Sequence, residues 1–359
     1  MANIETLADT PLLPEVAQEM HLVSLVRGAL ATTAIEGNTM TEEEARLAVE
    51  QQLKLPPSRE YQQVELTNMV EAFNRVMAEV RDATDPGALI LTPGRINDMN
   101  RQVLKNLDLE EGVVPGEISS HSVVVGAYRG APRRDCAYLL GRLCDWLERD
   151  FAEPNPYAME DAILKAILAH LYLAWIHPYG DGNGRTARLV ELFILCRSGV
   201  PAPAAHLLSN HFNDTRPIYY RELAKASQSG GEVVPFLMYA IQGLHDGLVQ
   251  QLERIRQQTE ELVWQRLVHQ AIPHHTSAAH RRRVLAIALF NEGKPVSRSG
   301  LVVLTPELVN EYAGKSSKTL TRDIHELERV QLIHRGSRGR YIASNDLILG
   351  LMPRRAPRI

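Results

Sequence analysis

The sequence of residues 177–188 is His-Pro-Tyr-Gly-Asp-Gly-Asn-Gly-Arg-Thr-Ala-Arg. An apolar helical pattern runs into this stretch over residues 161–176, and a second one runs out of it over residues 186–196. Because both patterns are apolar on most faces, each predicts a buried helix. The stretch is therefore predicted to be a loop between two buried helices, with the second helix beginning inside it.

The residue types in this loop suit a phosphate group. Gly182, Asn183 and Gly184 can adopt positive φ values, which turn successive backbone N–H groups towards one point. The following helix adds its free N–H groups and the positive end of its dipole. Arg185 and Arg188 lie three residues apart, close to one helical face, so their guanidinium groups can clamp phosphate oxygens.

The loop also contains a hard metal ligand and a base. Asp181 supplies a carboxylate beside the phosphate site, and Mg²⁺ prefers carboxylate and phosphate oxygens. His177 lies at the other end of the loop, where its imidazole can act as a general base. Asp-Gly and Asn-Gly are also ordinary turn dipeptides. The spacing alone therefore supports phosphate binding or transfer with a base, and no more.

The loop resembles the signature of Fic-domain proteins, His-Pro-Phe-x-(Asp/Glu)-Gly-Asn-Gly-Arg-x-x-Arg. It departs from the signature at Tyr179, whose ring is expected to pack into the core as the usual Phe does. The resemblance implies a mainly α fold: a Fic-type helical core with a short β-hairpin flap. It also implies a nucleotidyltransferase (EC 2.7.7 class, protein adenylyltransferase) that moves AMP from ATP, with Mg²⁺, to a Tyr, Thr or Ser hydroxyl of a target protein, including itself.

The same resemblance assigns roles to the loop residues. His177 takes the proton of the target hydroxyl, and Asp181 holds Mg²⁺. The residues that bind the ATP phosphates are Gly182, Asn183, Gly184, Arg185 and Arg188. A Tyr-Tyr pair borders the adenine in the family, so the ring of Tyr219 is expected to stack on the base.

Residues 32–37, Thr-Thr-Ala-Ile-Glu-Gly, resemble the inhibitory motif of Fic proteins, (Ser/Thr)-x-x-x-Glu-(Gly/Asn). In the family, this glutamate pairs with the second arginine of the loop. A bidentate pair between Glu36 and Arg188 would occupy the clamp that ATP needs. The resemblance therefore implies autoinhibition by Glu36, which without it reads as a solvated residue at a helix end.

Residues 123–126, Val-Val-Val-Gly, are the clearest β-type run in the front two-thirds of the chain. The run resembles the family's flap, a hairpin whose backbone pairs with the target peptide as an added strand. The residues that the resemblance assigns to target docking are Val123, Val124, Val125 and Gly126. Without the resemblance, the run reads as an ordinary short hairpin.

Charge is distributed unevenly along the 359 residues. From Arg281 onward there are 15 Lys/Arg against 7 Asp/Glu, whereas the rest of the chain has 24 against 36. This asymmetry predicts an acidic catalytic body and a basic appendage. Three helical patterns and an alternating, Gly-rich run at 333–342 resemble a winged helix, in which Lys318, Arg322 and the hairpin arginines can meet DNA phosphates. A protein-interaction or dimerisation module is the alternative.

We therefore expect five segments. They are an N-terminal helical region with the inhibitory motif (1–60), the Fic catalytic core (61–245), a helical linker (246–275), a winged-helix domain (276–345) and a basic tail (346–359). The spacing of Cys136, Cys144 and Cys196 fits no zinc site, which favours reduced core thiols in a cytoplasmic protein. Neither a membrane span nor a signal peptide is predicted. A homodimer is expected because dimers are common in the family.

Two further functions stay open at this point. The same site can remove AMP from a modified protein, with Glu36 orienting a water molecule, or it can use a different phosphate donor. In the second alternative, the chain is a DNA-binding regulator that uses the Fic core as a nucleotide sensor. His177 and Arg188 are both present, which indicates an active site without choosing among these reactions.

Overall fold

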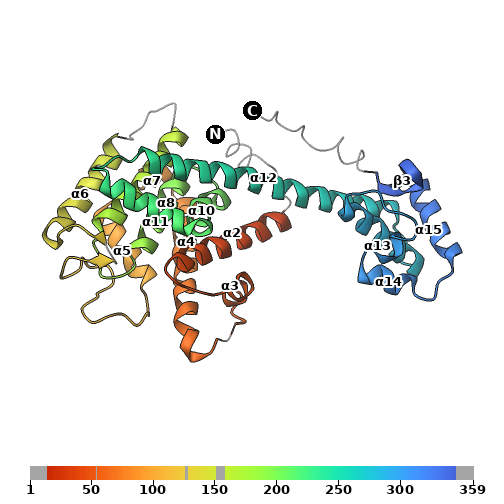
Figure 1. Cartoon of the computed structure of the whole chain (residues 1–359), viewed down its shortest axis with the longest axis horizontal. Helices are drawn as coiled ribbons and strands as arrows, with labels where there is room; N and C mark the ends of the chain where they lie inside the picture. The colour runs from red at the N-terminus through yellow and green to blue at the C-terminus, as the bar shows by residue number, and fades with distance from the viewer. Residues whose placement is uncertain (1–13, 54, 126–127, 151–157, 345–359) are drawn as a thin grey trace. The chain divides into compact units, whose positions relative to one another are not determined.

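The computed structural model describes residues 14–53, 55–125, 128–150 and 158–344 (Figure 1). The chain divides into two compact units, residues 1–252 and 253–359. Helices dominate the described part of both units, and each unit has one two-stranded antiparallel hairpin there. The mainly α fold that the sequence predicts is confirmed.

Unit 1 contains α2 (Pro14–Ile35), α3 (Glu42–Val49), α4 (Glu60–Asp82), α5 (Pro93–Val103), β1 (Val124–Val125), β2 (Tyr128–Arg129), α6 (Arg133–Asp150), α7 (Ala158–Ile176), α8 (Asn183–Arg197), α9 (Ala202–Ala205), α10 (Leu207–Asp214) and α11 (Arg216–Gln228). The boundary between the units falls within α12 (Val234–Ala271). Unit 2 then contains α13 (Ser277–Glu292), α14 (Pro306–Tyr312), α15 (Ser317–Arg329), β3 (Ile333–Arg335) and β4 (Tyr341–Ala343). Short 3₁₀ turns lie at Pro57–Arg59, Pro86–Ala88, Leu301–Val303 and Ser337–Gly339.

Threonine side chains cap the first turns of α3 and α5. Thr41 Oγ1 accepts a hydrogen bond from Glu44 N, and the Glu44 carboxylate accepts one from Thr41 N, which completes a capping box at α3. At the start of α5, Thr92 Oγ1 accepts a hydrogen bond from Arg95 N, and Pro93 is the first helical residue. These local signals fix where α3 and α5 begin.

Helix α8 lies in the core of unit 1 and packs against α7, α4 and α5 (Figure 1). Every residue of α8 except Gly184 is buried. Its apolar residues Leu189, Val190 and Phe193 are fully excluded from solvent. Because the helix also buries Arg185 and Arg188, these charged groups need partners from neighbouring elements. The loop between α7 and α8 is thus held at both ends by buried helices, as the sequence predicts.

The predicted flap forms a short hairpin in unit 1. Strand β1 pairs with β2 in the register Val124↔Arg129 and Val125↔Tyr128. Gly126, the last residue of the predicted flap run, lies outside the described residues. The hairpin follows directly from the apolar β-branched run in the sequence.

Unit 2 has the order of elements that the sequence predicts, three helices followed by a hairpin. Strands β3 and β4 pair from Ile333↔Ala343 to Arg335↔Tyr341. The buried core of this unit includes Trp264, Leu285, Leu289, Leu308, Ile324 and Leu327. Its identification as a winged helix stays a prediction, as does the five-segment division of the chain. The predicted basic tail at 346–359 lies outside the described residues.

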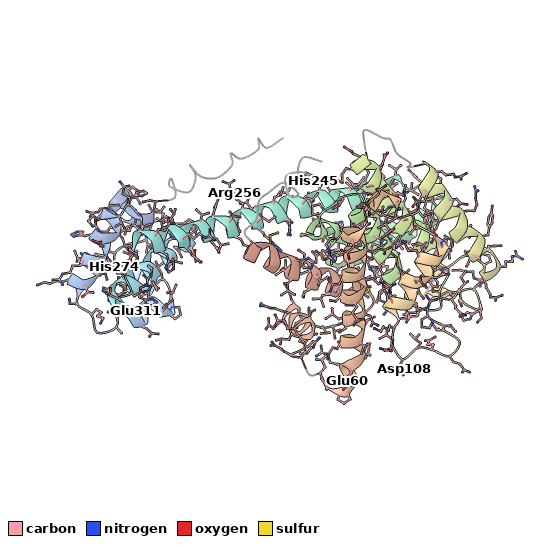
Figure 2. The ribbon with its side chains drawn as sticks, turned by 180° about the vertical axis from the view of Figure 1, so that it is seen from behind. Glu60, Asp108, His245, Arg256, His274 and Glu311 are labelled. Carbon is pink, nitrogen blue, oxygen red and sulfur yellow. The ribbon has the colours of Figure 1, made fainter. Side chains whose placement is uncertain are left out.

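Two acidic residues illustrate the exposed surface of unit 1, and the acidic character of the whole unit stays a prediction from its composition. Glu60 at the start of α4 and Asp108 after α5 are both exposed (Figure 2). The predicted burial of Cys136, Cys144 and Cys196 is confirmed, and all three thiols are free. Among the described residues, no helix combines the length and the apolar character that a membrane crossing needs.

Candidate active site

The loop between α7 and α8 turns sharply at Gly182. This residue has φ +75°, and a Cβ there would lie 3.0 Å from Leu104 Cδ2 and 3.1 Å from Asn100 Nδ2. Asn183 and Gly184 do not share the positive φ, because they already belong to the first turn of α8. The prediction of three residues with positive φ was therefore wrong. The anion site is the start of a helix, reached through one left-handed glycine.

The N-terminus of α8 has no side-chain cap. Gly182 is the N-cap residue and provides no side-chain hydrogen bond to the first turn. The Asn183 side chain points back at the loop, where its Oδ1 accepts from Tyr179 N (2.9 Å) and its Nδ2 donates to Tyr179 O (2.7 Å). The amide of Asn183 therefore braces the loop and does not face a phosphate, in contrast to its predicted role. What remains for an anion is the set of backbone N–H groups and the helix dipole.

Two residues of α5 hold the loop from the outside. Tyr179 is buried in the core as predicted, and its hydroxyl donates to Asn97 Oδ1 at 2.7 Å. Asn100 Nδ2 donates to the backbone carbonyl of Asp181 (3.0 Å) and to Thr186 Oγ1 (3.2 Å). Neither asparagine was predicted, because each contacts a residue more than 80 positions away. Together they fix the loop on α5.

His177 has the geometry of a neutral base. Its Nδ1 lies 3.2 Å from the carbonyl oxygen of Ala174, so Nδ1–H donates and Nε2 keeps its lone pair. Burial lowers the pKa of His177 below its ordinary value, which favours the neutral form. The ring also stands edge-on to Tyr128 of β2, with centroids 6.2 Å apart. The flap and the candidate base are therefore neighbours.

Asp181 is the residue that was predicted to hold Mg²⁺. Its Oδ1 accepts from Gly182 N (2.5 Å) and from Arg185 Nη2 (2.9 Å). The side chain is 46% exposed, so a cation can approach it. The described residues contain no group of three or more His, Cys, Asp or Glu side chains that could hold a metal ion. A cation here would need phosphate oxygens as further ligands.

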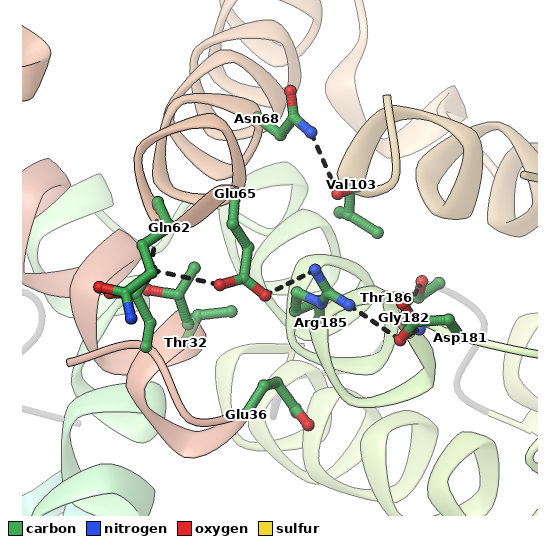
Figure 3. Close-up of polar contacts among 12 residues, drawn as sticks. Thr32, Glu36, Gln62, Glu65, Asn68, Val103, Asp181, Gly182, Arg185 and Thr186 are labelled. Atoms are coloured by element: carbon green, nitrogen blue, oxygen red, sulfur yellow. Dashed lines mark hydrogen bonds and ion pairs between the residues drawn. The ribbon is translucent and has the colours of Figure 1, made fainter. Parts of the chain in front are cut away.

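Arg185 is held between two carboxylates (Figure 3). Its Nη1 donates to Glu65 Oε1 at 2.7 Å, and its Nη2 donates to Asp181 at 2.9 Å. Glu65 comes from α4 and is 8% exposed. Burial raises the pKa of Glu65 by more than Arg185 lowers it. Glu65 was not predicted, because a single glutamate in an amphipathic helix is typical of a surface residue.

Arg188 is held by the end of α2. Its side chain is 1% exposed, and its Nη2 donates to Glu36 Oε1 at 2.5 Å and to Thr32 O at 3.0 Å. The pair that the sequence predicts is therefore formed, but through one hydrogen bond to Glu36 and not through a bidentate fork. Burial raises the pKa of Glu36, but Arg188, Arg185 and His177 together lower it by more, so the pKa lies below its ordinary value.

Glu36 places a negative charge at the start of α8. A Cβ atom at Gly184 would lie 2.2 Å from Glu36 Oε1 and 3.2 Å from Arg188 Nη1 and Nη2. The carboxylate and the guanidinium therefore meet at the first turn of the helix, which is where an anion is favoured. In this structure, a protein carboxylate takes the position that suits a phosphate.

Tyr219 does not have the exposed face that base stacking requires. The residue is 2% exposed, its ring stacks on Phe212 at 4.8 Å, and its hydroxyl lies 2.9 Å from His170 Nε2. The structure therefore buries the ring that was predicted to stack on adenine, and the adenine contact of Tyr219 stays a prediction. Its neighbour Tyr220 is 45% exposed, and its hydroxyl donates to Ile35 O at 3.1 Å, directly before Glu36.

The chain is similar in sequence to known proteins. Residues 90–195 match the sequence profile of the Fic/DOC family. Over 208 residues, the chain is 31% identical to a protein named protein adenylyltransferase fic-1 from Caenorhabditis briggsae. This match covers 58% of the chain but 37% of the relative, so the chain spans well under half of the relative's length.

Solved structures show the same fold. A Fic family protein from Desulfovibrio desulfuricans G20 is similar with a TM-score of 0.55 and 20% identity, over 95% of this chain and 94% of that chain. Fic-1 (residues 134–508) from Caenorhabditis elegans is similar with a TM-score of 0.57 and 24% identity, over 72% of this chain and 71% of that chain. At these identities the likeness concerns the fold alone.

Proposed function

We propose that this chain, which carries a Fic domain at residues 90–195, transfers AMP from ATP to a hydroxyl group of a target protein, including itself. The observation that supports the proposal most directly is the open first turn of α8, where a carboxylate meets the buried guanidinium of Arg188. A phosphate chain suits the same position. The name protein adenylyltransferase of the C. briggsae relative supports the choice of reaction.

In the proposed reaction, the target hydroxyl oxygen attacks the α-phosphorus of ATP. The new P–O bond forms as the bond from the α-phosphorus to the bridging oxygen breaks, and pyrophosphate leaves. His177 Nε2 accepts the hydroxyl proton, since Nδ1 is engaged with Ala174 O. Catalysis of this kind comes mainly from positioning and from electrostatic stabilisation.

The start of α8 supplies the positive field for the phosphates. Its first backbone N–H groups face the anion, and Arg188 adds a buried charge beside them. Arg185, three residues earlier on the same helix, holds Asp181. We assign the β- and γ-phosphates to these two arginines, with Arg188 freed by the departure of Glu36.

Asp181 fits a Mg²⁺ ion that is bound together with ATP. Its half-exposed carboxylate provides one hard oxygen ligand, and Mg²⁺ in nucleotide sites takes one or two carboxylates plus phosphate oxygens. When bound, the ion would neutralise charge on the phosphates. We propose Asp181 as the residue that holds it.

We further propose that Glu36 makes the enzyme autoinhibited. Its carboxylate lies at the first turn of α8 and is bonded to Arg188, so the γ-phosphate of ATP cannot take the same place. The flap is proposed to dock the target as an added strand at β1, where Val124 is 56% exposed. Val123 is buried beside it, which anchors the hairpin in the core.

The test is transfer of label from α-³²P-ATP with Mg²⁺ by the wild type, Glu36→Gly and His177→Ala. We expect covalent label on Glu36→Gly, little on the wild type and none on Glu36→Gly combined with His177→Ala. Glu50→Gly is the matched control, since it removes a carboxylate from the end of α3 without touching the site. If Glu36→Gly binds ATP but transfers no label, AMP removal or a nucleotide-sensing regulator becomes the better reading.

A second proposal concerns unit 2, and it rests on Asp323. This carboxylate is 1% exposed, and it accepts hydrogen bonds from Arg281 Nε (2.7 Å) and Arg282 Nε (2.8 Å). It therefore does not place negative charge on the outer face of α15. That face presents Lys318, Arg322 and His325, which are all exposed.

We propose that this basic face and the exposed arginines of the hairpin bind DNA in the manner of a winged helix. The hairpin residues are Arg335, Arg338 and Arg340. A gel-shift at low salt is the test, with Lys318→Ala and Arg322→Ala each expected to weaken binding and to lower the salt dependence. Absence of any shift at low salt would favour a protein-interaction module.

Two further expectations are carried forward as proposals, a cytoplasmic location and a homodimer. Cell fractionation tests the first, and light scattering of the purified chain tests the second. Neither enters the reaction proposed above.

A further inference from the structure

Glu65 contacts two different parts of the site with its two carboxylate oxygens (Figure 3). Oε1 accepts from Arg185 Nη1 at 2.7 Å, and Oε2 accepts from Asn38 Nδ2 at 3.2 Å. Asn38 lies two residues after Glu36, and its Nδ2 also donates to Gln62 O at 3.0 Å. Glu65 therefore joins the arginine of the loop to the segment that follows the inhibitory glutamate.

Arg185 also contacts Asp181, the candidate metal ligand. Arg185 Nη2 donates to Asp181 Oδ1 at 2.9 Å, so one guanidinium bridges Glu65 and Asp181. All these groups except Asp181 are largely buried. The orientation of Asp181 thus depends on where Arg185 is held, and α4 holds Arg185 through Glu65.

Glu65 also balances the charge of the buried Arg185 guanidinium. A buried guanidinium without a partner is costly, and breaking one half of a buried pair leaves the other half uncompensated. If Glu65 were removed, Asp181 would be the remaining carboxylate bonded to Arg185 within the described part of the site. The guanidinium would then draw more of the Asp181 carboxylate to itself, and that carboxylate would be less available to a cation.

We propose that Glu65 is a positioning residue of the phosphate and cation site: it fixes Arg185 from α4, so that Arg185 engages Oδ1 of Asp181 and the other carboxylate oxygen can hold Mg²⁺ with ATP. The inference rests on the proposed function, because it concerns how the same site takes MgATP. Partners in the layer behind a metal ligand typically change metal affinity about 10- to 100-fold when they are removed.

The experiment measures binding and not transfer, in the full chain with Glu36→Gly so that the inhibitory carboxylate is absent. Isothermal titration calorimetry gives the Kd of ATP at fixed Mg²⁺ and the Mg²⁺ concentration at half-maximal ATP binding. Glu65→Ala is expected to raise the Mg²⁺ midpoint by about tenfold or more. Glu65→Gln keeps an oxygen acceptor for Arg185 but loses the charge, so a smaller rise is expected.

Glu79→Gln is the matched control. Glu79 lies on the same helix and also pairs with an arginine, with its Oε1 2.7 Å from Arg95 Nη1, but it does not contact the loop in the described structure. It is expected to leave the Mg²⁺ midpoint unchanged. Thermal unfolding of each variant without ligand checks that the comparison is made on folded protein, and Glu65→Gln serves if Glu65→Ala does not fold.

Failure of the proposed function and failure of the inference about Glu65 give different results. If the Glu36→Gly chain binds no ATP at all, the proposed function fails before Glu65 is tested. If it binds MgATP and the Glu65 variants bind with an unchanged Mg²⁺ midpoint, the inference about Glu65 is overturned. Tighter MgATP binding by Glu65→Ala would also overturn it, because Glu65 would then compete with phosphate for Arg185.

Discussion

The carboxylate of Glu36 lies directly against Gly184, so closely that a Cβ atom at residue 184 would be 2.2 Å from Glu36 Oε1. Gly184 is an ordinary helical residue without positive φ. Its lack of a side chain is therefore not needed for the turn. It is needed because Glu36 approaches the helix start at this point.

Gly184→Ala is expected to displace the Glu36 carboxylate and so to weaken autoinhibition. The added methyl group cannot coexist with Glu36 Oε1 at its present position, whereas other neighbours lie at 3.2 Å or beyond. We expect more label transfer from ATP by Gly184→Ala than by the wild type. The measurement is the α-³²P-ATP assay with each single variant and with Gly184→Ala combined with Glu36→Gly.

The double variant separates two ways in which the methyl group can act. If it acts through Glu36, it has little effect once Glu36 is already glycine, and the two changes are non-additive. Equal losses of ATP binding in both backgrounds would instead mean that the methyl group obstructs the phosphate itself. That result would contradict the prediction.

His177 is expected to remain an active base below the ordinary pKa of histidine. Burial lowers its pKa, and Glu36, which raises it, is absent in Glu36→Gly. Because the base acts in its neutral form, the rate falls only as the pH drops through this lowered pKa. Single-turnover transfer by Glu36→Gly should therefore be flat from about pH 8 to about pH 6.5 and decline at lower pH.

Two measurements control this profile. ATP binding at each pH shows whether a loss of rate comes from binding, and His177→Ala in the same Glu36→Gly background should be slower by about 10²–10⁴-fold on the flat part of the profile, with a smaller difference at lower pH. A midpoint above pH 6.5 would show that the imidazole is not shifted in the direction that its burial requires.

The sequence was sufficient wherever a local pattern determines the structure. The loop lies between two buried helices, Thr41 and Thr92 cap their helices, and Glu36 pairs with Arg188. The first two follow from apolar periodicity and from capping chemistry. The third followed from a motif resemblance and not from any local rule.

Contacts between distant segments could not be predicted in the same way. Glu65 and Arg185 are 120 residues apart, and nothing near either residue marks the pair. Tyr219 and Tyr220 are adjacent on α11, so their side chains point about 100° apart and only packing decides which is buried. The structure buries Tyr219 and exposes Tyr220, the reverse of what a base-stacking role for Tyr219 needs.

Glu36→Gln is expected to destabilise unit 1, although the proposed autoinhibition predicts more AMP transfer by this variant. The change removes the charge that pairs with the buried Arg188, which costs about 1–3 kcal/mol of unfolding free energy. The pKa of Glu36 is lowered in the folded protein, so its contribution is present above the unfolded pKa of 4.5 and is lost as the pH falls through the folded pKa. Denaturant unfolding of both proteins should show a constant difference from pH 7 down to about pH 5.

Stabilisation by ATP tests whether Glu36 and ATP compete for Arg188. ATP at a hundred times its Kd should stabilise Glu36→Gln by about 3 kcal/mol, because Arg188 then regains an anionic partner, and the same ATP concentration should stabilise the wild type less. Equal stabilisation of the two proteins would mean that Glu36 and ATP do not compete for Arg188.

Asp323→Ala is expected to destabilise unit 2 strongly while leaving AMP transfer intact. Asp323 accepts from Arg281, Arg282 and the hydroxyl of Tyr312 (3.1 Å), and its removal leaves a buried arginine without its partner. Losing one member of such a buried network typically costs about 3–5 kcal/mol. Glu326→Ala is the control on the same helix, since its pair with the exposed Arg329 is worth about 0–1 kcal/mol. Denaturant unfolding of the full chain measures both losses, and label transfer by each variant in the Glu36→Gly background measures the effect on unit 1. An equal cost for the two variants would show that the charge of Asp323 is not what holds α15 on α13.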